Sequence, residues 1–558
     1  MADQGDVLVR GGMIVDGTGA PARPGDVRVR DGVIVEIGEG LEPSGGSERV
    51  VDATGALVTP GLIDSHTHYD LEMFWDPTLD PLPSYGMTTI IMGNCGLGIA
   101  PVRDDVKTDV ADLLCFIEEL PTTLAGEYVP WSWKTWSEYH AVASQTPLTV
   151  QPFAYVAHNA IRATVMGHEA WERAATDEEI TQMVELLDDA LRAGALGMST
   201  NWFDTDRNRK LVPSRLCNDA ELDALLDTIA KYPQASFQVI ARAASDRRRA
   251  LEKACARGIR CLSLGDGVGG AKKEEGLEIW HLGGGNQPFQ PMLGFEASIA
   301  AAAVPPWHEM INGPADDKLR KLADPEWRAA ARTAWDNPLP EQNSFRNEQL
   351  DIFILTDSEN GAGPLDISLK DLAEQRGVHP SDALADWVLA NGIGSRYTKL
   401  SSTVVQMNDD DRREMMKASL HDPFAIVGGT DAGAHLTMFC GAGSNLYLLT
   451  HWARDEGAVS IEQAIHCMTQ RSAEFFSLRD RGVIEEGKRG DLTVFALDEI
   501  ETRGFERRYD LPNDKYRLSR PSAGFRAVIV AGVPTVLDGK PTDARPTHLG
   551  NVLTAAAV

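Results

Sequence analysis

Two histidines separated by one residue, His66 and His68, are the first side chains whose types and spacing suggest chemistry. In an extended segment, side chains at i and i+2 lie on the same face, roughly 6.6 Å apart along the strand. One metal ion can join two imidazoles at that spacing, through bonds of about 2.0–2.1 Å. A loop with two unrelated histidines is the alternative. The apolar run that precedes them, residues 57–63, instead favours the carboxyl end of a barrel strand, where catalytic groups collect.

Two other apolar runs also end in residues that can bind a metal. Residues 88–92 lead into Cys95, and residues 424–427 lead through two glycines to Asp431. A cysteine thiolate is a strong soft ligand, and metal coordination deprotonates it. The alternatives are structural, because a buried cysteine also serves as a small hydrophobic residue and aspartate is common in turns and helix caps.

The elements that must position these residues alternate between strand and helix from residue 58 to residue 479. Residues 177–193 have an acidic start and apolar residues at helical spacing, and they end at Gly194 before a strand-like run at 195–200. This alternation predicts an α/β fold, a TIM-like (β/α)8 barrel with insertions. A doubly wound open sheet is the alternative, but no Gly-x-Gly-x-x-Gly turn supports it.

The two ends of the chain have a different texture. Residues 1–57 and 480–558 contain short alternating runs punctuated by Asp-Gly pairs and other glycines, as hairpins do. We expect both ends to build one small, discontinuous β-sandwich domain, with the barrel of residues 58–479 inserted into it.

Composition narrows the classes of partner. The 558 residues carry a formal charge of −29, from 82 acidic and 53 basic residues, which disfavours nucleic acid and anionic membrane surfaces. No apolar run is long enough for a transmembrane helix, and the first residues lack a signal peptide. Seven dispersed cysteines argue against a disulfide framework and for a reducing cytoplasm. We expect a cytoplasmic enzyme with a small-molecule substrate, and assembly into a homo-oligomer is left open.

These motifs together resemble the amidohydrolase superfamily, and within it a divergent member of the N-acyl-D-amino-acid deacylase (D-aminoacylase) branch. The resemblance is carried by residues 61–68, 93–96, 157–167, 194–200, 429–431, 460–465 and 481–492. It implies a divalent metal, zinc by default, held by His66, His68, Cys95 and Asp431. It also implies that Asp431 is the catalytic general base and acid for attack of water on a C–N carbonyl, a chemistry that a metal-activated water supports.

The sequence departs from the family where a second metal would bind. The family supplies two more histidines from the middle strands of its barrel, whereas this chain has no histidine between His168 and His281. We therefore expect one zinc ion per chain. Gln238, Cys261 and His281 are the remaining candidates for substitute ligands.

The substrate pocket departs as well. The family's deacylases carry a lysine after the later histidine and a His-Pro-Arg after the catalytic aspartate, both of which bind the substrate's carboxylate. Here Asp431 is followed by His435 and then Leu-Thr-Met-Phe. An uncharged or apolar amide, cyclic amide or ester fits better than an N-acyl-D-amino acid. His435, His158 and Asn159 are the predicted substrate contacts.

Three residues flanking the histidine pair, Asp64, Tyr69 and Asp70, are expected to orient its imidazoles.

Other functions stay open on the same scaffold. A metal-assisted lyase, decarboxylase or ester or lactone hydrolase is one, and a non-catalytic binding protein is another. Retention of all four ligand residues argues against the last.

Overall fold

In the computed structural model the described residues are 6–46, 48–264, 279–287, 292–295, 304–311, 313–337, 347–399, 409–512 and 515–546. They form two compact units. The first comprises Met1–Gln287, Arg413–Ala434 and Cys440–Val558, and the second comprises Pro288–Arg412 and His435–Phe439.

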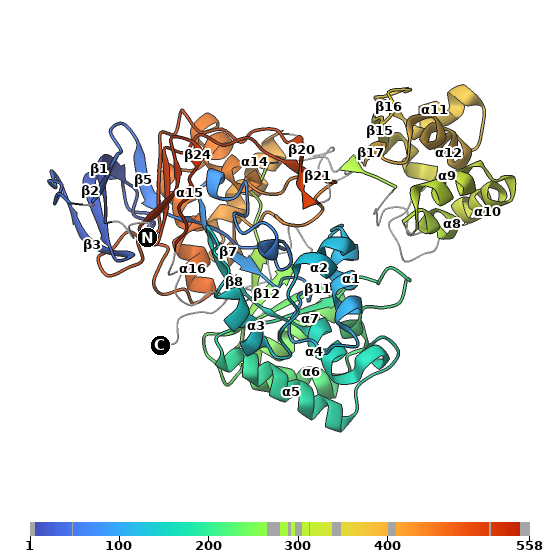
Figure 1. Ribbon diagram of the computed structural model, residues 1–558, viewed down its shortest axis with the longest axis horizontal. Helices are drawn as coiled ribbons and strands as arrows, with labels where there is room; N and C mark the ends of the chain where they lie inside the picture. Colours follow the sequence, from blue (N-terminus) through green and yellow to red (C-terminus); the bar gives the residue numbers. More distant parts are fainter. Residues whose placement is uncertain are drawn as a thin grey trace. The chain divides into compact units, whose positions relative to one another are not determined.

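Parallel strands that follow one another in chain order form the centre of the first unit (Figure 1). They are β6 (Leu62–Asp64), β7 (Met87–Met92), β8 (Gln151–Ala154), β9 (Val156–Ala157), β10 (Gly197–Trp202), β11 (Ser236–Ala241), β12 (Arg260–Leu264), β13 (Ile279–Leu282) and β18 (Ala425–Ile426). Strands β6 to β8 pair in sequence, and β9 to β13 pair in sequence and end on β18.

The ring of strands closes beyond the ends of β6 and β18. Thr67 and Ala432 form a parallel bridge there, and the backbone N–H of His68 donates to the carbonyl of Ala432 at 2.8 Å. Because only Tyr155 separates β8 from β9, these two segments act as one interrupted strand. The described strands therefore make an eight-stranded parallel barrel, and the predicted fold class is confirmed.

Helices alternate with the strands. Their sequences favour helix formation because they carry residues that cap the helix ends and apolar residues along one face. They include α1 (Lys107–Ile117), α4 (His158–Met166), α5 (Asp177–Arg192), α6 (Asp219–Ile229) and α7 (Ala244–Cys255). In α5, Thr176 and Glu179 form a capping box, and buried Ile180, Met183 and Leu187 recur at helical spacing. The helix predicted at 177–193 is therefore confirmed.

The two chain ends share one sheet, in the order β24-β23-β22-β19-β5-β1-β2-β3, with β4 paired to β1. Its strands are β1 (Val7–Ile14), β2 (Arg23–Arg30), β3 (Val33–Gly38), β4 (Arg49–Asp52), β5 (Leu57–Pro60), β19 (Leu492–Phe495), β22 (Ala527–Val530), β23 (Val533–Leu537) and β24 (Lys540–Pro541). Strand β5 runs antiparallel to β19, with Val58 opposite Val494. Gly61 alone separates β5 from β6, so the terminal sheet passes directly into the first barrel strand. The exact domain limits at residues 57 and 480 stay a prediction.

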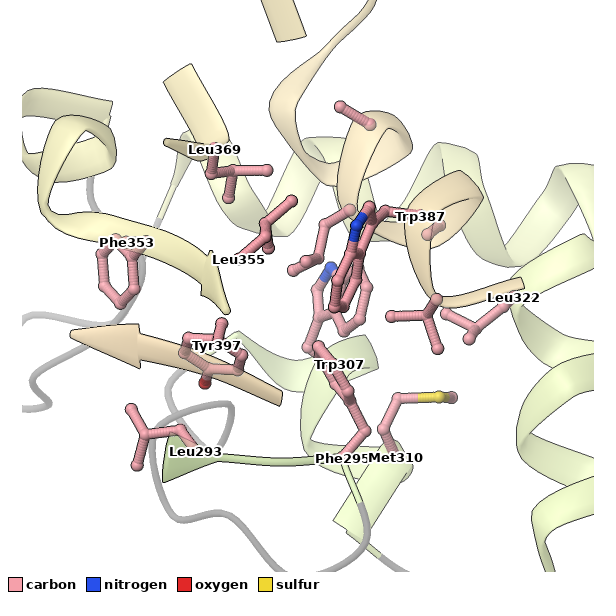
Figure 2. Close-up of a cluster of buried hydrophobic side chains, with 14 of the residues drawn as sticks. Leu293, Phe295, Trp307, Met310, Leu322, Phe353, Leu355, Leu369, Trp387 and Tyr397 are labelled. Carbon is pink, nitrogen blue, oxygen red and sulfur yellow. The ribbon is translucent and has the colours of Figure 1, made fainter. Parts of the chain in front are cut away.

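The second unit has a hydrophobic core of its own (Figure 2). Its elements are β14 (Met292–Leu293), β15 (Phe353–Asp357), β16 (Ile367–Ser368), β17 (Arg396–Lys399), α8 (Pro305–His308), α9 (Ala315–Ala323), α10 (Pro325–Asp336), α11 (Leu369–Arg376) and α12 (Pro380–Asn391). Trp307, Trp387 and Tyr397 are almost completely buried in this core, and the indole of Trp307 donates to Ser381 Oγ at 2.9 Å. The sequence predicts insertions in the barrel segment, but not a separately packed unit.

Among the described residues, no helix combines the length and the apolar character that crossing a membrane requires.

Candidate metal centre

The segment after β6 bends at Ser65 and His66, forms an isolated bridge at Thr67, and carries both histidines of the predicted pair. The backbone N–H and the hydroxyl of Thr67 each donate to the carbonyl of Ile91, at 2.9 and 2.8 Å. His66 and His68 flank Thr67, so alternation along the chain turns both imidazoles to the opposite side. The same-face placement predicted from their spacing is thus confirmed.

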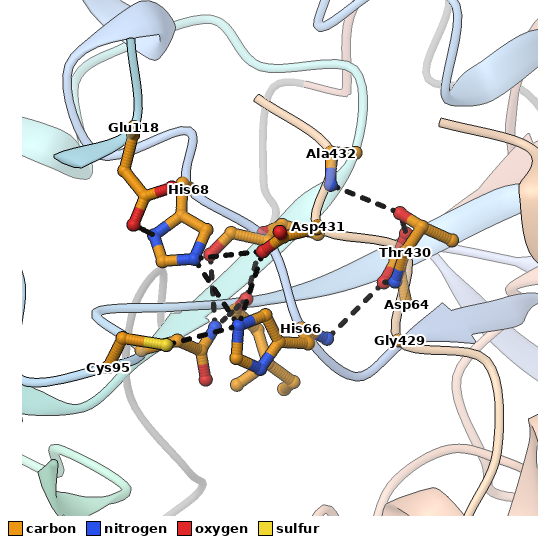
Figure 3. Close-up of polar contacts among 12 residues, drawn as sticks. Asp64, His66, His68, Cys95, Glu118, Gly429, Thr430, Asp431 and Ala432 are labelled. Atoms are coloured by element: carbon orange, nitrogen blue, oxygen red, sulfur yellow. Dashed lines mark hydrogen bonds and ion pairs between the residues drawn. The ribbon is translucent and has the colours of Figure 1, made fainter. Parts of the chain in front are cut away.

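Four side chains that the sequence brings from three separate strand ends converge at this point (Figure 3). The Nε2 atoms of His66 and His68 are 3.3 Å apart, and Cys95 Sγ is 3.5 Å from His66 Nε2. Asp431 Oδ1 lies 3.4 Å from His66 Nε2 and 3.2 Å from His68 Nε2. Four potential donors therefore face one small volume.

Their spacing fits a tetrahedral metal ion. With bonds of about 2.0–2.1 Å to nitrogen or oxygen and about 2.3 Å to sulfur, tetrahedral angles place N and O donors about 3.3 Å apart and N and S donors about 3.6 Å apart. The distances among His66 Nε2, His68 Nε2 and Asp431 Oδ1, and from His66 Nε2 to Cys95 Sγ, are 3.2 to 3.5 Å and match those values. Imidazole, thiolate and carboxylate are also the donor types that zinc prefers. The residues present thus fit the metal that the motif implies.

Two of the four donors sit on strained backbone. Cys95 and Asp431 have φ angles of 55° and 61°, in the left-handed region that side chains other than glycine rarely adopt. Such strain persists only where the surroundings fix it, and it clusters at functional sites. Close packing helps to hold the backbone around Asp431 in place. A Cβ atom at Gly429 would lie 2.8 Å from His66 Cβ, so only glycine allows this approach.

Asp64 ties the two ends of the barrel together beneath these donors. Its carboxylate accepts hydrogen bonds from the backbone N–H groups of Thr430 at 3.1 Å and His66 at 3.3 Å. Burial raises the pKa of Asp64 to about 7, against these hydrogen bonds. Asp64 therefore positions the histidine segment through its backbone. The sequence analysis expected Asp64 to contact an imidazole, but in the structure its carboxylate contacts backbone N–H groups.

Burial also sets the protonation of His66 and Cys95 in the metal-free protein. It lowers the pKa of His66 to about 4, although the charge of Asp431 opposes this, so the ring is a neutral ligand at neutral pH. It raises the pKa of the Cys95 thiol to about 12, and a bound cation reverses that effect because the thiolate is the ligand form. Asp431 differs from both histidines because 39% of its side chain is exposed, against 7% and 1%.

A family comparison agrees with the motifs: the model described as "Amidohydrolase family" matches residues 49–323 and 381–536. The chain belongs to the amidohydrolase family. An N-acyl-D-glutamate deacylase of Alcaligenes xylosoxydans xylosoxydans is 26% identical over 561 residues, 98% of this chain and 97% of the relative. An uncharacterized protein of Mycobacterium tuberculosis is 29% identical over 537 residues, 88% of this chain and 84% of the relative.

Solved structures share the fold. The crystal structure of an N-acyl-D-glutamate deacylase from Bordetella bronchiseptica, complexed with zinc and a phosphonate inhibitor, has a TM-score of 0.63 and 22% identity. It covers 96% of this chain and 98% of that one. A D-aminoacylase structure has a TM-score of 0.62 at 21% identity, over 97% of this chain and 98% of that one.

In this amidohydrolase an amide side chain lies beside Cys95, on the middle strand β11. Gln238 Oε1 accepts from the backbone N–H of Cys95 at 2.8 Å, and its Nε2 donates to Asn94 Oδ1 at 2.8 Å. Both polar atoms of the amide are therefore engaged with the loop that carries the cysteine. Of the three candidate substitute ligands, Gln238 is the one that contacts this loop.

The other two candidates point elsewhere. Cys261 Sγ lies 3.7 Å from Cys255 Sγ on α7 and donates to the carbonyl of Ile259. His281 Nε2 lies 3.1 Å from an oxygen of Asp422, which precedes β18 at the amino end of that strand. Neither residue joins the four donors.

Two of the three predicted substrate contacts have structural partners. His158 is fully buried, and its nitrogens lie 2.9 Å from Thr200 Oγ1 and 2.8 Å from Glu221 Oε1. Asn159 donates to the carbonyl of Gly96 at 2.9 Å and accepts from the backbone N–H of Ser214 at 2.8 Å. These contacts hold the barrel loops and do not support a direct role for either side chain with substrate.

The third predicted contact, His435, belongs to the second compact unit, where its ring lies 5.3 Å from that of Phe439. Its role in substrate binding stays a prediction. Of the two other flanking residues, Asp70 accepts from the backbone N–H of Gly93 at 3.3 Å and Tyr69 is buried. Asp70 thus supports the loop after β7, and no hydrogen bond joins either residue to a ring nitrogen of the pair among the described residues.

One residue of this region was missed in the sequence. Glu118 follows α1, and its Oε1 lies 3.6 Å from His68 Nδ1. A grouping of metal-capable side chains places it with His68 and Asp431, within 4.8 Å of one another. The signal that was available is a pair of glutamates placed directly after an apolar helical run.

Proposed function

We propose that this chain is a metal-dependent hydrolase that cleaves the C–N bond of an amide or cyclic amide in a small organic molecule, with one zinc ion per chain. The observation that carries the proposal is the convergence of Cys95 Sγ and Asp431 Oδ1 on the paired Nε2 atoms of His66 and His68, at 3.2 to 3.5 Å. Membership of the amidohydrolase family supports the reaction class.

A single ion is favoured by what occupies the middle of the barrel. The donor that would bind a second ion from β11 is replaced by Gln238, whose amide already holds the Cys95 loop. A neutral amide oxygen is also a weaker ligand for zinc than imidazole or thiolate.

When bound, zinc polarises a carbonyl and lowers the pKa of the water it holds toward about 7. The chain's own contribution is then proton transfer at Asp431. Its carboxylate is more exposed than either histidine, so it can reach both water and substrate. Asp431 takes a proton from the attacking water and delivers it to the leaving nitrogen, which completes hydrolysis with one acid–base group.

The proposed substrate class follows from the residues that stand where the family has its carboxylate-binding arginine and lysine. The named relatives are deacylases of N-acyl-D-amino acids. This chain lacks the arginine of the His-Pro-Arg motif, a residue type suited to bidentate binding of a carboxylate, and it also lacks the lysine of the family motif. We therefore propose an amide without a free α-carboxylate.

The test is elemental analysis of metal per chain in the wild type and in the His66→Ala and Asp431→Ala variants, followed by a screen of amides, cyclic amides and esters. We expect about one zinc ion per wild-type chain, loss of it in both variants, and hydrolysis of an uncharged amide. Two ions per chain would contradict the single-ion proposal. Metal without C–N cleavage, and with Asp431 still needed for another reaction, would favour the lyase or decarboxylase alternative.

A further inference from the structure

Glu118 has no role in the proposed reaction, and it lies where a negative charge is energetically unfavourable. It is the residue that ends α1, and only 4% of it is exposed. The C-terminal end of a helix carries partial negative charge, which favours cations and opposes a carboxylate. Burial adds a desolvation cost for the charge. A carboxylate held there despite both effects points to a function that needs it.

The backbone next to Glu118 is strained as well. Glu119 adopts a left-handed conformation with φ of 52° and is 6% exposed. This conformation after a helix is usually taken by glycine, which has no Cβ to clash. The chain instead places a second buried glutamate there. The turn is therefore fixed by its surroundings, and it holds the carboxylate of Glu118 in one place.

What Glu118 faces is the outer nitrogen of a metal-site histidine (Figure 3). Its Oε1 lies 3.6 Å from His68 Nδ1, while Nε2 of the same ring faces Asp431 at 3.2 Å and His66 Nε2 at 3.3 Å. The ring of His68 thus has an acidic group at each nitrogen. Neither Nδ1 atom has a hydrogen-bond partner among the described residues, and His68 differs from His66 in the carboxylate that faces its Nδ1.

We propose that Glu118 is a positioning residue for His68. Its carboxylate favours a proton on Nδ1, which leaves the lone pair of Nε2 directed at the metal and makes the imidazole a stronger donor. At 3.6 Å the contact is an ion pair and not a short hydrogen bond, so the charge of Glu118 carries most of the effect. This proposal rests on the proposed function only in requiring that the four donors hold a metal ion.

The test compares metal affinity in the full-length wild type, Glu118→Ala, Glu118→Gln and the matched control Glu119→Gln. The dissociation constant for Zn²⁺ is measured by competition with a chromogenic chelator, and the visible absorption of the Co²⁺-loaded proteins reports the ligand geometry. Removal of such a supporting carboxylate lowers metal affinity by about 10- to 100-fold. We expect that loss in Glu118→Ala, a smaller loss in Glu118→Gln, a changed Co²⁺ spectrum in both, and an effect below about twofold in Glu119→Gln.

Thermal unfolding of the metal-free proteins separates a folding defect from this effect, and Glu118→Gln keeps the shape of the side chain if the alanine variant fails to fold. Wild-type affinity and an unchanged Co²⁺ spectrum in both Glu118 variants would overturn the positioning role. So would a Glu118→Ala protein as depleted in metal as His68→Ala, since Glu118 would then be a direct ligand. A wild type that binds no metal would instead refute the proposed function.

Discussion

Two buried histidine clusters in the same barrel show what distinguishes a ligand site from a structural one. Around His66 and His68, nitrogen, sulfur and oxygen atoms converge at 3.2 to 3.5 Å. Around His158, each ring nitrogen already has a partner, Thr200 or Glu221, and Glu221 also pairs with Arg162. Both clusters are buried and both contain acidic groups.

The two clusters differ in how much hydrogen-bonding capacity their histidine nitrogens leave unused. Histidines that face one another without a donor between them leave lone pairs for a cation, whereas a histidine between a hydroxyl and a carboxylate has none left. Cys217 lies close enough to His158 and Glu221 to complete a nominal metal-binding group. The cation beside Glu221 is already supplied by Arg162, so we interpret this second cluster as structural.

The strongest way to test the comparison is to remove a ligand from the first cluster. We expect His66→Ala to lose its zinc and to lower turnover by on the order of 10³-fold, because the metal contributes several kcal/mol to the transition state and each 1.36 kcal/mol is tenfold. Elemental analysis and rate measurements on the same preparation check this. A variant that keeps both metal and turnover would contradict the ligand assignment.

The matching change in the second cluster is Arg162→Met, which leaves the carboxylate of Glu221 buried beside His158 alone. We expect a loss of about 3–5 kcal/mol in the free energy of unfolding, since breaking a buried pair strands a charge. Chemical denaturation measures the loss, and metal content per folded chain should not change.

Arg192→Met is the control for that experiment, because Arg192 pairs with Asp188 on the exposed side of α5. Its expected cost is below about 1 kcal/mol. Equal losses in the two arginine variants would remove the distinction between a buried and an exposed pair.

Acid should weaken the second cluster through Glu221. Burial opposes the charge of Glu221, but His158 and Arg162 outweigh it and lower the pKa of Glu221 from 4.5 to about 2. A carboxyl group whose pKa is lower in the folded state contributes stability above its unfolded pKa and loses it as pH falls through the folded pKa. We expect a contribution of about 3 kcal/mol that is lost between pH ~4.5 and pH ~2. Unfolding free energies at several pH values, compared with Glu221→Gln, isolate this contribution, and parallel profiles would refute it.

A smaller loss of stability than in Arg162→Met is expected at Gln238, which contacts the loop that carries Cys95. Gln238→Ala leaves the buried N–H of Cys95 and the amide oxygen of Asn94 without their partner, at a cost of about 1–3 kcal/mol. The variant should keep one zinc ion per chain. A fall in metal stoichiometry from two to one would identify Gln238 as a ligand and contradict the single-ion proposal.

The sequence predicted the four donors because each follows an apolar strand within a few residues, so a local pattern reports a position in the barrel. Glu118 was missed because the glutamate pair after the apolar run of α1 is a weak signal, and nothing in the local sequence shows that this helix end packs against His68. Strand register explains why Cys261, one of three candidate substitute ligands, does not join the site. Cys261 pairs with Phe237 and not with Gln238, so its side chain alternates to the other face of the sheet. The second compact unit was missed because its tryptophans are scattered over the segment and pack only in three dimensions.

The closure of the barrel also sets when the site can form during protein synthesis. Asp64 and Thr430, which join the first and last strands, are 366 residues apart in the chain. At about 5–20 residues per second, the ribosome needs roughly 20–70 s to make that interval. The histidines of the first strand must wait that long for Asp431, and the N-terminal strand β5 waits longer for its partner β19. Until then the nascent chain exposes unpaired strand edges, so its biogenesis is the stage most sensitive to delay.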